Sequence, residues 1–291
     1  MWFYLALATT VISAVSVILR KKLLGGVSPS VLTWCTLVLA TPIIAVVTLK
    51  EGIPDLDSYF VIGILGSVLF YTSSSILQFR AIKKSELSAV YPLVTLGPLF
   101  TLLVSIFPPL NERPAVSAVV GVLMTLCGAY ILNAGKAREG LLQPFKLLFS
   151  NRTSIVMIVS VLLESVVIIF DKLAINNTLP KNTNFVLLTE NLLIIIALPP
   201  VLFMRNRNFA QQIFANKKLL IILGALNAFS SILAFSAVGE GDVGVVAAIL
   251  KAQLLFVLLF SFIFFKDRPK PETVIGSIIM IIGVVLIKLG V

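Results

Sequence analysis

The sequence predicts an all-α integral membrane protein in which ten transmembrane helices form two inverted five-helix repeats. Three observations lead to this fold class: the composition, a series of long apolar runs, and a similarity between the two halves of the chain. Of the 291 residues, 58% are hydrophobic and only 12% are charged. A soluble domain carries about 25% charged residues, so we infer that lipid surrounds most of this chain.

The composition also excludes several classes of function. The chain has no histidine, which is the commonest general base and metal ligand. Cys35 and Cys127 lie alone in separate apolar runs, so neither a disulfide framework nor a zinc-binding spacing is present. The formal net charge is +10, but the basic residues lie at the ends of apolar runs, as they do in membrane proteins. We therefore expect no cofactor and no nucleic-acid partner.

Ten apolar runs are candidates to cross the roughly 30 Å of hydrocarbon in a bilayer. They lie at 2–19, 30–49, 59–79, 87–107, 115–133, 153–171, 185–203, 219–237, 243–265 and 273–289. We predict one helix for each run, because a helix satisfies its own backbone hydrogen bonds in lipid. The first run lacks a preceding basic segment and a small-residue cleavage site, so we interpret it as a retained span rather than a signal peptide.

The longest connection divides the chain almost equally. We predict a first repeat at 1–135, a linker at 136–152 and a second repeat at 153–291. LQFRAI at 77–82 matches LAFSAV at 233–238. Because each repeat holds five spans, the second copy must enter the membrane in the opposite orientation. Such inverted repeats are typical of secondary transporters, whose sites lie near the bilayer midplane between the repeats.

The last helix of each repeat carries the longest match. ERPAVSAVVGVLMTLCGAYIL, which begins at Glu112, aligns with DRPKPETVIGSIIMIIGVVLI, which begins at Asp267. The alignment pairs two glycines of each helix, Gly121 and Gly128 with Gly276 and Gly283. A spacing of seven places both glycines on one helix face, where they allow close backbone approach.

Three ionisable side chains lie well inside predicted spans, and all belong to the second half: Glu164, Glu190 and Lys251. Burying one unpaired costs about 2.5 kcal/mol or more, so partners or water must be near. The first half has Ser13 opposite Glu164 and Thr95 opposite Lys251. We predict a site in a central cavity, where Lys251 meets an anionic group and a glutamate meets an amine or a proton. The alternative is a structural Glu–Lys pair that clamps two helices.

Further polar residues are candidates for the cavity wall. Thr9, Ser13, Ser16 and Arg20 share one face of the first helix, and Asp171 follows Glu164 on one face of the sixth. Trp34 is either a cavity wall or lipid-facing. Serines shared by helices three and eight, Ser74 with Ser230, fit close packing better than binding. The candidate substrate-binding or coupling residues are Lys251, Glu164, Glu190, Tyr91, Thr95, Gln78, Ser13, Trp34 and Asn227.

Two motifs add a family resemblance. The pattern A-x-x-x-S-x-L-S-A-V-Y-P-L occupies 81–93, and an acidic-Arg-Pro turn precedes both 115–133 and 273–289. With the five-plus-five repeat, the chain resembles the EamA-type ten-helix branch of the drug/metabolite transporter superfamily over nearly its whole length. The resemblance implies a basket of helices around a central cavity, with 115–133 and 273–289 packed at its side. It does not select a substrate, because the family carries many metabolites.

The basic residues of the connections indicate an orientation. The odd-numbered connections hold 17 lysines and arginines, whereas the even-numbered connections and the C-terminus hold 5. The positive-inside rule therefore places the odd connections in the cytoplasm and both termini outside. The resemblance implies the opposite, with both termini inside. We expect a multi-pass protein of a prokaryotic plasma membrane, as a monomer or weak homodimer.

These features predict a secondary transporter that moves a small polar or amphoteric, amino-acid-like metabolite by alternating access. Protons are the candidate coupling ion, and exchange is the alternative. A second possibility is a phosphorylated or nucleotide-type anion as cargo, which requires at least two cationic groups in the cavity. A third is an integral-membrane lipid-modifying enzyme, and a fourth is a non-transporting subunit. The chain has no P-loop and hence no ATP-driven step.

Overall fold

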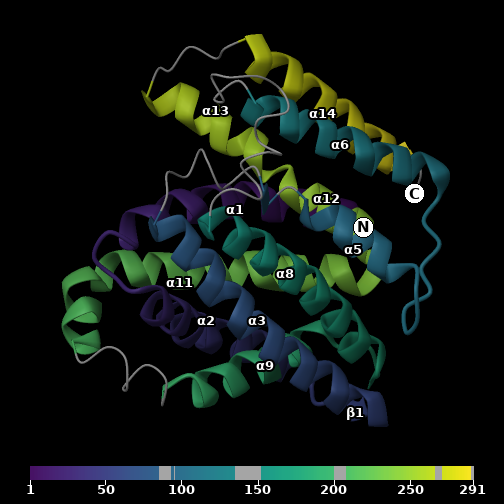
Figure 1. The fold of residues 1–291 in the computed structure, drawn as a ribbon. Helices are drawn as coiled ribbons and strands as arrows, with labels where there is room; N and C mark the ends of the chain where they lie inside the picture. The colour runs from purple at the N-terminus through teal and green to yellow at the C-terminus, as the bar shows by residue number, and fades with distance from the viewer. Residues whose placement is uncertain (85–92, 95, 135–151, 200–207, 266–270, 290–291) are drawn as a thin grey trace.

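The computed structural model describes residues 1–84, 93–94, 96–134, 152–199, 208–265 and 271–289 as an almost entirely helical protein (Figure 1). Its helices are α1 (Trp2–Leu23), α2 (Pro29–Glu51), α3 (Ser58–Lys84), α5 (Gly97–Ser105), α6 (Val116–Ala134), α8 (Arg152–Asn176), α9 (Thr183–Ala197), α11 (Phe209–Glu240), α12 (Val243–Lys251), α13 (Gln253–Phe265) and α14 (Pro271–Leu289). Two short strands, β1 (Asp55–Leu56) and β2 (Thr178–Leu179), complete the described part. The linker predicted between the repeats lies outside the described residues, apart from Arg152.

The helices have the length and surface of membrane spans. Within the described residues, α1, α2, α3, α8 and α11 are long and apolar enough to cross a bilayer, whereas the other apolar helices are shorter. Large aliphatic and aromatic side chains on several helices face outward: Leu49, Ile62, Leu65, Leu69, Ile196 and Phe229 are all more than half exposed. An apolar outer surface of this kind suits contact with lipid tails. The count of ten spans stays a prediction.

Helices pair across the two halves of the chain. The helix α1 packs against α11, and its counterpart α8 packs against α3. Three further contacts join helices with the same position in each half: α2 with α9, α5 with α12, and α6 with α14. This exchange of partners is what two interlocked copies related by a two-fold axis produce. The two halves therefore form one body rather than two separate bundles.

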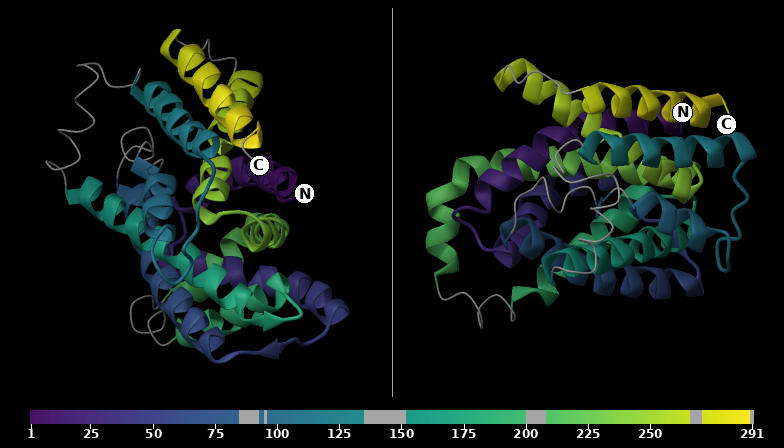
Figure 2. Two further views of the ribbon diagram at one scale, coloured as in Figure 1. Left: turned by 90° about the vertical axis from the view of Figure 1, so that its right-hand side faces the viewer. Right: turned by 45° about the horizontal axis from the view of Figure 1, so that its top comes forward.

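The contact between α6 and α14 confirms the predicted role of the glycines. A Cβ atom at Gly128 would lie 2.6 Å from the carbonyl oxygen of Gly276, and one at Gly121 would lie 2.7 Å from that of Gly283. Any side chain there would force the helices apart, so glycine permits their close approach. The pair lies along one side of the molecule in all views (Figures 1 and 2).

The apolar run 243–265 differs from the single helix predicted for it. The helix α12 ends at Lys251, a turn follows at Ala252, and α13 begins at Gln253. The Ala252 N–H donates to the Ile249 carbonyl, a tighter bond than the α-helical one. The break leaves Lys251 at a helix C-terminus, where the helix dipole favours a positive charge. The segment contains no proline, so proline is not the cause of this break.

A two-stranded antiparallel ladder ties the halves together at one end of the molecule. Asp55 faces Leu179 and Leu56 faces Thr178 in β1 and β2. Side-chain bonds reinforce the ladder: the Asn184 amide donates to Glu51 over 2.8 Å, and the Asn182 amide donates to the Gly52 carbonyl over 3.2 Å. We call this end, with the connections 52–57, 177–182 and 241–242, the strap end. The opposite end, where α1 leads into α2, carries the basic cluster of Arg20, Lys21 and Lys22.

Candidate functional site

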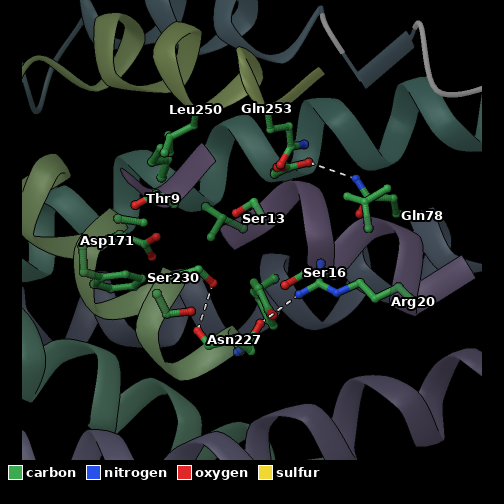
Figure 3. A pocket seen from close by; sticks show the side chains of 18 of the residues that line it. Thr9, Ser13, Ser16, Arg20, Gln78, Asp171, Asn227, Ser230, Leu250 and Gln253 are labelled. Carbon is green, nitrogen blue, oxygen red and sulfur yellow. Dashed lines mark hydrogen bonds between the residues drawn. The ribbon is translucent and has the colours of Figure 1, made fainter. Parts of the chain in front are cut away.

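A cavity of about 320 Å³ lies between the two halves. Its described wall comes from α1, α2, α3, α8, α9, α11, α12 and α13. The polar or charged side chains that line it are Thr9, Ser13, Ser16, Arg20, Lys21, Tyr71, Gln78, Glu164, Asp171, Glu190, Asn191, Asn227, Ser230, Ser231, Lys251 and Gln253. Figure 3 shows many of these side chains pointing toward a common space. A concave site with converging polar groups is the usual form of a small-molecule site.

The Lys251 ammonium forms an ion pair inside this cavity. Its Nζ atom lies 3.0 Å from Oε1 of Glu164, and Gln78 donates from Nε2 to Oε2 of the same carboxylate over 3.1 Å. The Glu164 side chain is 43% exposed and that of Lys251 is 16% exposed. The pair is therefore neither sealed in dry packing nor extended to a lipid headgroup. A mid-helix carboxylate this accessible indicates that water or a solute enters the cavity.

Arg20 forms a second polar centre on the same cavity wall. Its guanidinium donates to Oδ1 of Asn227 over 2.8 Å and lies 5.8 Å from the centre of the Phe79 ring. The Nε atom of Arg20 is buried without a hydrogen-bond partner. A guanidinium with a free N–H next to a bound one is a ready receptor for a carboxylate, which accepts two parallel bonds.

Asp171 lies across the cavity from Arg20 (Figure 3), and a second acidic side chain, that of Glu190, lines the same cavity. Asp171 accepts a 2.5 Å hydrogen bond from the Ser67 hydroxyl. The Oε1 atom of Glu190 is buried without a partner. Thr9 lies on this side, and Thr9 and Arg20 are eleven residues apart on α1, or roughly 16 Å along the helix axis. The cavity thus has an acidic side and a basic side.

The two sides are related by the internal repeat. The register that aligns Ser13 with Glu164 also aligns Arg20 with Asp171 and Lys21 with Lys172. Both residues contact the other half of the chain. Arg20 donates to Asn227 on α11, and Asp171 accepts from Ser67 on α3. Matching positions of an inverted pair therefore carry opposite charges at the two sides of the cavity.

The lysines next to these residues make matching contacts. Lys21 donates to the carbonyl of Ile82 over 3.0 Å, and Lys172 donates to that of Val238. Ile82 and Val238 are themselves aligned by the match between 77–82 and 233–238. The sequence predicted Arg20 and Asp171 only as residues of the cavity wall. The register that aligns Ser13 with Glu164, continued by seven positions, pairs these two residues.

The predicted site residues are distributed as follows. Lys251, Glu164, Glu190, Gln78, Ser13 and Asn227 all line the cavity. Tyr91 and Thr95 lie outside the described residues. Trp34 is not among the described lining residues, because its indole N–H donates to the Ile195 carbonyl and its ring packs against the hydrophobic core. The prediction that placed Trp34 in the site is therefore corrected to a packing role.

Several small hydroxyl groups serve the backbone. Thr9 donates to the carbonyl of Leu5, and Ser16 donates to that of Ile12. Ser74 donates across a helix contact to the carbonyl of Ser160. These bonds fit the packing interpretation of small polar residues in membrane helices. Within the part of the chain that is described, no three His, Cys, Asp or Glu residues gather as metal ligands do.

Inverted helix pairing, an apolar outer surface and a charged cavity between the halves are together typical of a secondary transporter. Comparison of the sequence with family models identifies the family: residues 1–134 and 151–289 match the model of the EamA-like transporter family. The chain therefore belongs to this family, which is part of the drug/metabolite transporter superfamily and whose members are membrane transporters rather than enzymes.

A comparison with solved structures supports the fold. One crystal structure, titled only as that of a protein, superposes with a TM-score of 0.68 at 17% sequence identity. The match covers 99% of this chain and 95% of the other. At this identity the similarity concerns the fold alone. No curated protein matches the sequence.

Proposed function

We propose that this protein is a secondary transporter that moves a small amphoteric, amino-acid-like metabolite through the cavity by alternating access. The observation that carries the proposal is the Lys251–Glu164 ion pair, which lines the cavity and has a 43% exposed carboxylate. Charged groups inside a membrane protein are costly and mark the pathways of substrates and ions. An ion pair that served only to hold two helices together would be strengthened by exclusion of water. This pair is not shielded in that way, because its carboxylate is exposed.

The charges of the cavity favour a cargo that carries both signs. The described wall holds three cationic side chains, Arg20, Lys21 and Lys251, and three acidic ones, Glu164, Asp171 and Glu190. A carboxylate of the cargo finds donors at Lys251 and at the free N–H of Arg20, and its amine finds acceptors at the glutamates. A cavity of about 320 Å³ lies at the small end of the range for ligand sites.

In alternating access, the cavity is closed at one end of the molecule while it is open at the other. The strap end is tied by β1 and β2, whereas the cavity wall continues to Arg20, Lys21 and Ile82 at the opposite end. We take the cavity to be open toward that basic end. The excess of basic residues in the odd-numbered connections places this end in the cytoplasm. The structure then corresponds to an inward-facing state, with both termini outside.

One observation favours a second candidate cargo. Arg20 lines the cavity, and its Nε atom is buried without a partner. Arg20 and Lys251 are thus two cationic groups at the same cavity, and the alternative anionic cargo requires at least two. Phosphate oxygens accept bonds from guanidinium groups as carboxylates do. Three acidic side chains on the same wall make a doubly charged anion the less favourable cargo.

Transport by the purified protein in liposomes tests the proposal. Liposomes loaded with unlabelled amino acids are mixed with labelled amino acids, and the labelled molecules taken up are identified by mass. We expect exchange by the native protein and by Lys50→Met, whose lysine is exposed at the end of α2. Lys251→Met is expected to abolish exchange while the protein still folds. Exchange of inorganic phosphate or AMP instead selects the anionic cargo, a product of altered mass selects an enzyme, and unchanged exchange by Lys251→Met contradicts the assigned site.

A further inference from the structure

The acidic side of the cavity holds two carboxyl groups from different helices. Asp171 on α8 is 7% exposed and Glu190 on α9 is 5% exposed. Both side chains line the cavity, so they are buried in protein but adjacent to the space that a solute or water enters.

The surroundings of the two groups show where a proton fits. A buried carboxyl group without a nearby cation is costly to ionise, so it keeps a proton unless hydrogen-bond donors stabilise its charge. Asp171 accepts from the Ser67 hydroxyl over 2.5 Å, which stabilises the ionised form of Asp171. The Oε1 atom of Glu190 is buried without a partner. The proton therefore belongs on Glu190.

No cation neutralises this pair in the way that Lys251 neutralises Glu164. Among the described residues, the one side-chain ion pair within 4 Å is that of Lys251 and Glu164. Lys172 follows Asp171 on α8, but its ammonium donates to three main-chain carbonyls at the end of α11. Two adjacent carboxylates without a counter-ion repel each other in a low dielectric, and one bound proton removes that repulsion.

Other charged or titratable groups face the pair from the neighbouring helices. These are Tyr71 on α3, Arg20 and Lys21 on α1, Glu164 on α8 and Lys251 on α12. The helices α2 and α11, which pack against α9, contribute only uncharged side chains to the described cavity wall, and so does α13. Arg20 lies across the cavity from Asp171 (Figure 3), so it does not take the place of the shared proton.

We propose that Asp171 and Glu190 form the proton-binding site that couples transport to a proton gradient, an inference that rests on the proposed function. The Glu190 carboxyl gives its proton to a water molecule in the cavity and leaves two adjacent carboxylates. These bind the ammonium group of the cargo, which supplies the positive charge that the proton supplied before. Proton and cargo amine thus exclude each other at this site, and the transporter exchanges cargo for a proton. The assignment of coupling to Glu164 is less favourable, because Lys251 and Gln78 already donate hydrogen bonds to that carboxylate.

Infrared difference spectroscopy tests the proton without any cargo. The C=O stretch of a protonated carboxyl group is followed as the pH of the purified protein is raised. We expect a band that disappears at alkaline pH in the native protein, is absent in Glu190→Gln, and persists in Glu240→Gln, whose glutamate is exposed at the end of α11. Asp171→Asn, which keeps an acceptor for Ser67, is expected to shift the pH at which the band disappears. A native-size band in Glu190→Gln, or a band that responds to Na⁺ at constant pH, overturns the inference.

Transport separates this inference from the proposed function. With one proton exchanged per cargo molecule, a pH difference of one unit drives about tenfold accumulation of labelled amino acid. We expect Glu190→Gln to lose both this response and the exchange of labelled for unlabelled amino acid, because its amide mimics the protonated carboxyl, which excludes the cargo amine. Absence of exchange in the native protein contradicts the proposed function. Retained exchange with a native response to the pH difference in Glu190→Gln contradicts only the proton site.

Discussion

Two matching corners of the molecule, at opposite ends of the repeats, are built alike but differ in their surroundings. At the basic end, Lys21 donates to the carbonyl of Ile82 over 3.0 Å and borders the cavity. At the strap end, Lys172 donates to the carbonyls of Val238, Gly239 and Gly241 over 2.5, 3.2 and 2.9 Å and is 8% exposed. Each lysine thus holds the end of the third helix of its own repeat.

Further contacts close the strap-end corner. Lys181 donates to the Gly239 carbonyl, and the Val243 N–H donates to the Glu112 carboxylate over 2.8 Å. The difference teaches how an inverted repeat can alternate: in the described residues, the same parts form an enclosed corner at the strap end and a corner that borders the cavity at the basic end. Transport then needs the two ends to exchange arrangements rather than to form new kinds of contact.

Locking the strap end with a disulfide is expected to have the largest effect, which is on transport. Asp55 and Leu179 are antiparallel partners, and such partners have Cα separations that a disulfide accepts. In a Cys127→Ser background, oxidised Asp55→Cys/Leu179→Cys is expected to lose nearly all amino-acid exchange in liposomes, and a reductant is expected to restore it. Each single cysteine variant serves as the control. Full exchange by the oxidised double variant shows that this end does not open.

Replacing the two lysines separately is expected to have a smaller effect, on stability. Lys172→Met leaves buried carbonyls without a charged donor, and hydrogen bonds to charged groups contribute about 1.5–3 kcal/mol each. Lys21→Met is expected to lower the free energy of unfolding by less, because Lys21 is only partly buried, whereas Lys172 is 8% exposed. Thermal unfolding in detergent measures both variants. Equal losses contradict the difference between an enclosed and an open corner.

The smallest expected effect concerns a carboxylate in a connection at the strap end. Burial raises the pKa of Glu112, although the bond from the Val243 N–H opposes the shift. Between its ordinary pKa of 4.5 and the raised value, the folded state binds more protons than the unfolded state. Stability should therefore fall as the pH rises through this window. Glu112→Gln keeps an acceptor for Val243 and should flatten the melting temperature over the same window; an unchanged slope contradicts the assignment.

The sequence predicted those features that depend on the period and spacing of residues. The apolar runs, the match between the repeats and the glycine contacts of α6 and α14 follow from local patterns, and the deep positions of Lys251, Glu164 and Glu190 follow from run length. The break after Lys251 was not predictable, because VGVVAAILKAQLLFVLLF has no proline or glycine at that point.

The pairing of charges across the cavity also needed the structure. A residue's partner on another helix depends on helix rotation and crossing, which spacing along one helix does not give. Lys172 illustrates this limit: in the sequence it is one more cation at the end of a span, whereas the fold turns it toward three carbonyls of α11. The repeat register is the signal that links it to Lys21.

Labelling of one residue tests most directly whether this cavity is the transport path. Ser13 lines the cavity beside Thr9 and Ser16 and is the first-half counterpart of Glu164. In a Cys127→Ser background, Ser13→Cys is treated with a membrane-impermeant thiol reagent added to the side of the basic end. We expect modification to stop amino-acid exchange and excess amino acid to slow the modification. A cysteine that does not react, or one that reacts without affecting exchange, contradicts a transport path through this cavity.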